Sequence, residues 1–373
     1  MMATAIDRGL VADEGLVPTS HMHVLSDAAG GVEGGLTYPF GGRAPAPGEL
    51  VTVLPGIRWW RVPMSGPLKH VNGLILDDGA GVMAVDTGTR GEDSVAAWKA
   101  LLAGPLADTP VSRVLCTHFH PDHVGLAGWL CHRFDAPLLM TRTEWLMVRM
   151  LVADAQPEVP QGMTDFWRGA GWDAAQIATA SARGWGNFGR YVSRLPIGFT
   201  RLRDGEALTI DGAAWEVVTG SGHSPEHACL LDRERRVLIA GDQVLPRISS
   251  NVSLTVSEPE GDPLGDWLAS IAKLKRLPDD LLVLPGHGDP FYGLHARLDA
   301  LDAEHRERLD GLEAYLTEPR RAVDCFARLF RRAIGPDVIG MATGEALAHL
   351  RRLEVEGRAV RETRDGVWWY ARG

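Results

Sequence analysis

The stretch THFHPDHVG, residues 117–125, places three histidines and an aspartate within six consecutive positions. Histidine accounts for only 13 of the 373 residues, so this density calls for an explanation. The preceding run VSRVLCT indicates a β-strand that ends at the cluster. Imidazole and carboxylate are the usual protein ligands of Zn²⁺ and Fe²⁺. Side chains so close in sequence cannot all complete one tetrahedron, so the cluster suits two neighbouring metal ions better.

Three further candidate ligands lie far along the chain, each at the end of a β-like run. His223 follows the run AAWEVVTG, Asp242 ends the run RVLIAGD, and His287 follows the run DLLVLPG. A glycine precedes each of them and lets the backbone approach closely, because no Cβ is in the way. Three separate strand ends that supply His, Asp and His therefore strengthen the prediction of a two-metal site.

Charge and composition narrow the classes of function. The net charge is −10, from 38 basic and 48 acidic residues, and disfavours general attraction to nucleic acid. No apolar run reaches about 18 residues, so no membrane span is expected. The four cysteines form no CxxC pair and the N-terminus lacks a signal-peptide pattern, so we expect a reduced, cytoplasmic protein.

The pattern of elements predicts three parts. Residues 1–49, rich in Gly and Pro, are expected to form an N-terminal arm, within which GLVPTSHM partly matches a protease-site remnant of an expression vector. Residues 50–292 alternate strands and helices and predict an α/β catalytic domain. Within it, residues 142–200 form a helical insertion, with helices expected over TEWLMVRMLV and DAAQIATASARGWGNFGRYVSRL.

The insertion contains four tryptophans, whose usual role is to pack in a core. Its apolar content would equally suit a lid over an acyl or aromatic substrate. Both interpretations remain open from the sequence. The tryptophans are Trp145, Trp167, Trp172 and Trp185.

Residues 293–373 predict three helices, over GLHARLDALDAEHRERLDGLEAYL, AVDCFARLFRRAI and ATGEALAHLRRLEVEG, and then a closing hairpin. This order is typical of a winged-helix module. Residues 318–373 carry 11 Arg against 8 Asp plus Glu, a net charge of +3. That excess is weak for nucleic-acid binding, so we expect a packing surface, or one that forms a homodimer.

Together the motifs HFHPDH, GHSPEH, AGDQ, PGHG and AVDTG resemble those of the metallo-β-lactamase fold superfamily, over roughly residues 50–295. The resemblance implies an αββα sandwich, two mixed sheets between helices, with metals at one sheet edge. The stretch DHVGLAG departs from the pattern, since many relatives carry a Gly pair directly after the histidine; this affects the shape of the loop more than its ligands. The implied ligands are His118, His120 and His223 for one metal, Asp122, His123 and His287 for the other, and Asp242 between them.

The resemblance also implies a reaction. Two ions would lower the pKa of a bridging water toward about 7, and the hydroxide would attack an ester, thioester or lactone of a small molecule. Asp86 would orient a metal-bound histidine, Asp122 could also relay a proton, and His227 is a further candidate near the site. Zn²⁺ is the expected ion, although iron and manganese accept the same ligands.

Other classes of function fit the same motifs less well. A phosphodiesterase or ribonuclease of the same superfamily would need more basic surface, and an exported β-lactamase-like amide hydrolase would need a signal peptide. A DNA-binding regulator that uses the C-terminal module would not need a complete set of metal ligands.

Overall fold

The computed structural model of the chain describes residues 31–64, 68–331 and 333–373. The suspected vector remnant therefore lies outside the described residues, as does most of the predicted arm. In the described part of the arm, strands β1 (Val32–Glu33) and β2 (Leu36–Thr37) form a small hairpin. Thr37 pairs through its backbone with Tyr292, so this segment is anchored to the body of the protein.

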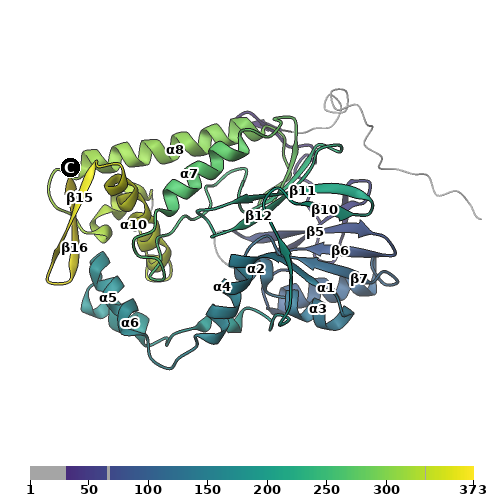
Figure 1. The fold of residues 1–373 in the computed structure, drawn as a ribbon, viewed down its shortest axis with the longest axis horizontal. Coiled ribbons are helices and arrows are strands. Elements are labelled where there is room, and N and C mark those ends of the chain that lie inside the picture. The colour runs from purple at the N-terminus through teal and green to yellow at the C-terminus, as the bar shows by residue number, and fades with distance from the viewer. Residues whose placement is uncertain (1–30, 65–67, 332) are drawn as a thin grey trace, which may run out of the picture.

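Two β-sheets form one side of the molecule, opposite the C-terminal hairpin and helices α5 (Gln161–Ala170) and α6 (Ala174–Ser181) (Figure 1). In the larger sheet the strands up to β6 pair antiparallel, and β6 to β9 pair parallel. In the smaller sheet only β13 and β14 pair parallel. The larger sheet contains β3 (Val51–Leu54), β4 (Ile57–Pro63), β5 (His70–Asp78), β6 (Gly81–Val85), β7 (Val111–Leu115), β8 (Leu138–Thr141) and β9 (Thr200–Leu202). The smaller contains β10 (Ala207–Ile210), β11 (Ala213–Gly220), β12 (His227–Asp232), β13 (Val237–Gly241) and β14 (Leu282–Pro285).

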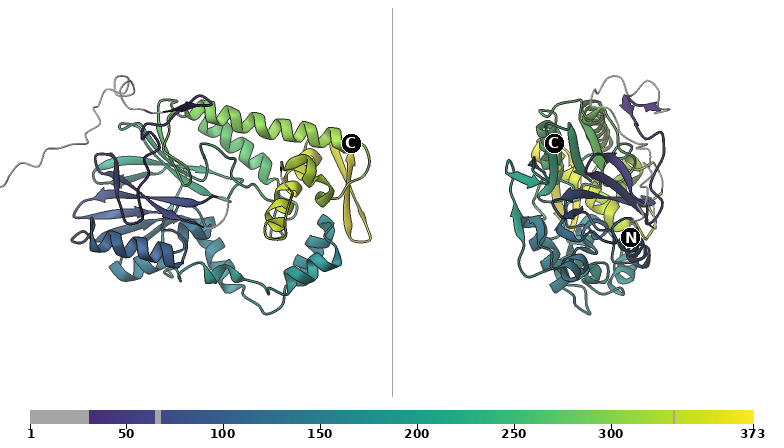
Figure 2. Two further views of the ribbon diagram at one scale, coloured as in Figure 1. Left: turned by 180° about the vertical axis from the view of Figure 1, so that it is seen from behind. Right: turned by 90° about the vertical axis from the view of Figure 1, so that its right-hand side faces the viewer.

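Helices cover the outer face of each sheet, so the predicted αββα sandwich is confirmed (Figures 1 and 2). Helices α1 (Glu92–Ala103) and α3 (Ala127–Phe134) pack on the larger sheet; α7 (Pro263–Leu274) and α8 (Leu294–Tyr315) pack on the smaller. The adjacent residues Trp59 and Trp60 of β4 show why both faces are covered. Because neighbouring strand residues point to opposite faces, Trp60 meets Trp98 of α1 at 4.9 Å between ring centroids, whereas Trp59 packs between the sheets.

The helical insertion differs in part from the sequence prediction. It contains α4 (Arg142–Ala153), α5 (Gln161–Ala170), α6 (Ala174–Ser181) and a 3₁₀ turn at Asn187–Arg190. The long helix expected from residue 173 ends early, because Gly184 and Gly186 adopt left-handed φ angles of 71° and 80°. Helix α5 was not predicted; its sequence looks like a Gly- and Pro-rich connection, and buried Phe166 and Trp167 stabilise it through tertiary packing.

Within the C-terminal module, α10 (Ile339–Val355) packs against α8, and it contacts the catalytic domain through α7. The helix expected over AVDCFARLFRRAI is instead two short pieces, a 3₁₀ turn at Ala322–Cys325 and α9 (Phe326–Leu329). The predicted hairpin is present as β15 (Ala359–Arg364) and β16 (Val367–Arg372). The winged-helix assignment itself stays a prediction. Within the described ranges, no helix combines the length and apolar character needed to cross a bilayer.

Candidate metal centre

The candidate ligands lie in loops that follow the ends of β7, β11, β13 and β14, at one edge of the sandwich. The short helix α2 (Pro121–Val124) carries Asp122 and His123. Two glycines make the approach possible. A Cβ at Gly286 would lie 2.2 Å from Oδ1 of Asp242, and one at Gly222 would lie 2.5 Å from Cβ of Trp267. The glycine interpretation of these loops therefore holds in the structure.

Three ring nitrogens from His118, His120 and His223 form a triangle. Nε2 of His118 lies 2.9 Å from Nδ1 of His120, which lies 3.0 Å from Nε2 of His223. The third side, between the two Nε2 atoms, is 3.3 Å. A tetrahedral zinc ion with bonds of 2.0–2.1 Å would hold its ligand nitrogens about 3.3 Å apart. The triangle therefore has nearly the size that such an ion requires.

A second set of ligand atoms lies beside the first. Nε2 of His287 is 3.2 Å from Oδ2 of Asp122, and Nε2 of His123 is 3.6 Å from the same oxygen. Asp242 faces both sets: Oδ1 is 3.4 Å from Nε2 of His123, and Oδ2 is 3.6 Å from Nε2 of His223. The structure thus brings the seven predicted ligands together, with Asp242 between the groups.

Unpartnered buried atoms show that the residues fit a bound cation. Nε2 of His123, Nε2 of His287 and Oδ1 of Asp242 are buried and have no hydrogen-bond partner among the described residues. Such groups are costly to bury unless something satisfies them. A divalent ion would accept all three lone pairs at once.

Hydrogen bonds on the far side of the rings select the coordinating nitrogen. Nδ1 of His223 donates to the carbonyl of Asn251 at 2.8 Å, and Nδ1 of His287 donates to the carbonyl of His70 at 2.5 Å. Since a carbonyl can only accept, each ring keeps its Nε2 lone pair for a metal. The structure therefore places His70 as a support for His287.

Asp86 lies where the sequence predicts, behind a ligand. Its Oδ2 accepts from Nδ1 of His123 at 2.7 Å, and its Oδ1 accepts from the backbone amide of Thr117 at 2.8 Å. The Thr117 hydroxyl also donates to Asp86, so it accepts from Nδ1 of His118 at 3.0 Å. One carboxylate thus orients a histidine of each ligand group.

The electrostatics of the two groups differ. Burial, reinforced by neighbouring imidazoles, lowers the pKa of His120 to about 3 and that of His118 well below its usual value. For His287, burial lowers the pKa, but the Asp242 and Asp122 carboxylates outweigh it and raise the pKa to about 10. A metal ion would replace the proton that this carboxylate-rich group otherwise attracts.

His227 was predicted as a candidate near the reacting groups, and the structure places it beneath them. It is fully buried, and its Nε2 accepts a hydrogen bond from the backbone amide of Asp242 at 3.1 Å. Its ring stacks on that of His118 at 4.8 Å between centroids. His227 therefore supports two candidate ligands and is itself shielded from solvent.

Sequence reasoning missed Glu144, a fully buried carboxylate of α4. Burial raises the pKa of Glu144 to about 7, although three hydrogen-bond donors stabilise the anion and act to lower it. It accepts from the amides of Phe119 and Glu226 and from the hydroxyl of Ser224. An acid on the buried side of the apolar helix TEWLMVRMLV is the signal that could have identified it.

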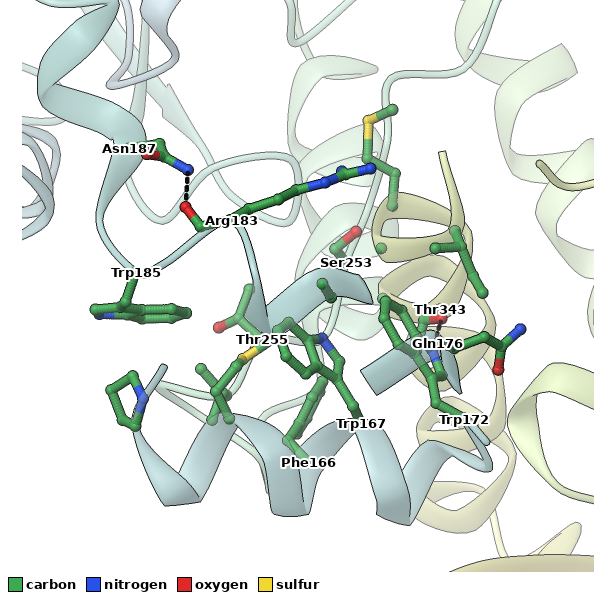
Figure 3. Close-up of a pocket in the computed structure, with 18 of the residues that line it drawn as sticks. Phe166, Trp167, Trp172, Gln176, Arg183, Trp185, Asn187, Ser253, Thr255 and Thr343 are labelled. Carbon is green, nitrogen blue, oxygen red and sulfur yellow. Dashed lines mark hydrogen bonds between the residues drawn. The ribbon is translucent and has the colours of Figure 1, made fainter. Parts of the chain in front are cut away.

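Figure 3 shows an apolar cavity of about 1130 Å³, which reaches the metal centre at Phe119, whose ring centroid lies 4.4 Å from that of His120. Phe119, which sits between two ligands, lines it, as do α4, α5, α6, residues 253–257 and the start of α10. Trp167, Trp172 and Trp185 line this cavity, whereas the half-buried Trp145 stacks on Phe199 at the edge of a core cluster. Trp167 and Trp172 also belong to a buried core cluster, so they are core residues that form part of the cavity wall.

An αββα sandwich with a histidine- and aspartate-lined edge defines a metal-dependent hydrolase. A sequence model of the Metallo-beta-lactamase superfamily matches residues 66–287, and one of the Metallo-beta-lactamase-like, C-terminal domain matches residues 309–373. The chain belongs to the metallo-beta-lactamase superfamily and is an enzyme of its hydrolase class.

Solved structures of similar proteins cover nearly the whole chain. A beta-lactamase domain protein from Burkholderia ambifaria is 39% identical, with a TM-score of 0.83 over 91% of this chain and 98% of that one. A metallo-beta-lactamase family protein from Thermus thermophilus is 30% identical, with a TM-score of 0.73 over 86% of this chain and 100% of that one.

Curated relatives are more distant. The probable metallo-hydrolase YqjP of Bacillus subtilis is 26% identical over 75% of this chain and 87% of its own length. The hydroxyacylglutathione hydrolase GloC of Haemophilus influenzae is 24% identical over 58% of this chain and 84% of its own length. An atrochrysone carboxyl ACP thioesterase of Aspergillus fumigatus is 24% identical over 62% of this chain and 41% of its own length.

Proposed function

We propose that the protein is a binuclear metal-dependent hydrolase of small-molecule esters, thioesters or lactones, with Zn²⁺ as the resident ion. The observation that carries the proposal is the pair of ligand groups that share Asp242. Seven side chains would hold two ions, and the spacing of the first three nitrogens supports zinc.

Two bound ions would supply Lewis acidity that yields hydroxide near neutral pH and polarises a carbonyl. The protein's own side chains orient the ligands and hold a proton. Asp86 keeps the rings of His118 and His123 oriented through their far nitrogens. Asp122 is the most accessible ligand carboxylate, at 13% side-chain exposure against 7% for Asp242, so it is the better placed to hold a proton.

The substrate class follows from the surroundings of the site. The adjoining cavity is mostly apolar and would suit an acyl group better than a phosphodiester. Two of the curated relatives are named as a thioesterase and a hydroxyacylglutathione hydrolase, both of which point to acyl chemistry.

A nuclease would need cations where the chain offers few. Among the described residues that line the cavity, Arg183 is the single cation against three aspartates. Phosphate binding depends on Lys and Arg, so this charge balance disfavours RNA as substrate.

A panel of substrates tests the proposal. The full-length protein, loaded with Zn²⁺, would be assayed on a thioester, a lactone, an aryl ester, bis-p-nitrophenyl phosphate and single-stranded RNA, each with and without a chelator. We expect chelator-sensitive hydrolysis of at least one acyl compound. Strong RNA cleavage without acyl hydrolysis would overturn the proposal.

A further inference from the structure

Two walls of the cavity beside the metal centre come from segments that lie far apart in the sequence. One wall consists of the insertion helices α4, α5 and α6. The other is the segment that leads into α10 of the C-terminal module, from Ile334 to Gly344. Nε1 of Trp172 donates to the hydroxyl of Thr343 at 2.9 Å, so the two walls are joined by a buried hydrogen bond (Figure 3).

We propose that this cavity binds the acyl group of the substrate, that this group is large and apolar, and that the C-terminal module is a wall of the substrate pocket. This inference rests on the proposed acyl hydrolase function. It assigns the module a part in substrate selection, through the side chains at the start of α10.

The metal end of the cavity is defined by two segments that touch ligands. The ring of Phe119 lies 4.4 Å from that of His120, measured between centroids. Ser253 lines the cavity two residues after Asn251, whose carbonyl holds His223. A carbonyl held at the metals would therefore have its acyl group next to Phe119 and Ser253.

The far part of the cavity is aromatic. Trp167 and Trp172 stack in parallel at 5.1 Å between centroids, and Phe166 lies on the same helix as Trp167. Figure 3 shows these rings along one side of the cavity, with Arg183 extended across the other. Such a surface gains free energy by covering apolar atoms but offers a charged acyl group no partner.

The charged residues of the lining are already engaged. Asp173 caps α6 by accepting from the amide of Gln176, and Asp154 accepts from Nε1 of Trp185. Arg183 and Asp337 lie 3.9 Å apart with exposed side chains, so they mark the rim. A volume of about 1130 Å³ slightly exceeds the usual range for pockets that bind drug-sized ligands, roughly 300–1,000 Å³. Size and polarity both favour a bulky hydrocarbon group.

Thioesters with one shared leaving group test this inference. The zinc-loaded full-length protein would be assayed with the acetyl, octanoyl, dodecanoyl and 2-naphthoyl thioesters of N-acetylcysteamine. Burial of each added methylene can raise kcat/KM by up to roughly fourfold. The kcat/KM values of the thioesters with larger acyl groups should therefore exceed that of the acetyl thioester by at least about tenfold. Comparison of the dodecanoyl and naphthoyl thioesters shows whether the cavity prefers an alkyl chain or an aromatic ring system.

Two glycines allow the cavity to be filled without disturbing a contact. Gly162 of α5 and Gly340 of α10 line opposite walls, and a Cβ at either would meet nothing within 4 Å. Both are helical, so leucine should favour the local fold. We expect Gly162→Leu and Gly340→Leu each to lower the dodecanoyl-to-acetyl ratio of kcat/KM at least about tenfold. Gly198→Leu, at an equally open position outside the cavity lining, is the matched control.

The outcomes separate the two proposals. A ratio that falls in both cavity variants and not in the control supports the inference. Equal rates for all acyl groups, or a ratio that the cavity variants leave unchanged, would overturn it while leaving the hydrolase proposal intact. If the metal-loaded protein hydrolyses none of these thioesters and no ester or lactone of the earlier panel, both proposals fail.

Discussion

Glu144 accepts a hydrogen bond from the backbone amide of Phe119 at 2.8 Å, and so ties helix α4 to the loop that carries His118 and His120. The same carboxylate accepts from Ser224 and Glu226, which follow His223. One buried side chain of the insertion thus holds both loops of the first ligand group. The insertion is therefore part of the metal site as well as a wall of the cavity.

Removal of this carboxylate should weaken both the fold and the first ligand group. Glu144→Ala leaves three donors without an acceptor, at a cost of at least about 3 kcal/mol in the free energy of unfolding, and metal affinity should fall about 10–100-fold. Glu144→Gln keeps one acceptor oxygen, so its stability and metal affinity should lie between those of the wild type and of Glu144→Ala. Denaturation and metal titration measure both effects, with exposed Glu158→Ala as the control. Wild-type metal affinity in a folded Glu144→Ala protein would contradict this role.

Loss of the shared carboxylate should empty the site. Asp242 faces both ligand groups, so we expect Asp242→Ala to retain less than one equivalent of metal. Activity on the acyl substrates should fall at least about 100-fold, because loss of a residue that only supports a ligand already lowers activity by up to about 100-fold. Elemental analysis and kcat/KM check the two effects, and His132→Ala, exposed on α3, is the control. Two retained equivalents would refute the ligand assignment.

Asp86→Asn separates the charge of the supporting group from its shape. Asp86 has a left-handed φ of 57°, a conformation that asparagine tolerates, so the backbone should survive the change. The hydrogen bonds to His123 and Thr117 would lose their anionic partner. We predict a 10–100-fold loss of metal affinity, which is about the usual effect of removing a residue that orients a metal ligand. Competition with a chromogenic chelator measures this loss. Unchanged affinity would mean that Asp86 does not orient the ligands.

A buried histidine pair should make the protein sensitive to acid. Ring nitrogens of His305 in α8 and His349 in α10 lie 3.4 Å apart, with Arg308 nearby. Burial lowers the pKa of His305 to about 3 and that of His349 to about 4. In the unfolded chain these histidines have pKa values near about 6.5, so they take up protons at a higher pH than in the folded protein. The stabilisation from the neutral pair is therefore complete above about pH 6.5 and is lost as the pH falls toward about 4. For each histidine the free energy of unfolding falls by up to about 1.4 kcal/mol per pH unit.

Urea denaturation at pH 7.5 and 5.0 checks this dependence. The double variant His305→Gln, His349→Gln should lose less stability between these pH values than the wild type, by at least about 1 kcal/mol. Both proteins carry the same metal ligands, so their difference isolates the pair. Identical pH dependence in the two proteins would refute the prediction.

The candidate metal ligands could be identified from the sequence because each follows a strand whose apolar pattern is clear. The spacing of His118, His120, Asp122 and His123, and the glycines before His223, Asp242 and His287, are local properties of the chain. The final hairpin is equally local, and it appears as predicted. The hydrogen-bond partners of Glu144 and the coordinating nitrogen of each histidine could not be predicted, since they depend on contacts between distant segments.

By itself, then, the sequence determined which side chains are candidate metal ligands and that strands and helices form an α/β domain, because hydrophobic periodicity and strand-end motifs act over a few residues. Tertiary structure alone decided that α5 is a helix, that His227 lies beneath the ligands, and that the insertion and the C-terminal module share one cavity. These features depend on burial and hydrogen bonds between segments as far apart as Trp172 and Thr343. Such energies arise only when the chain has folded and excluded water from between them.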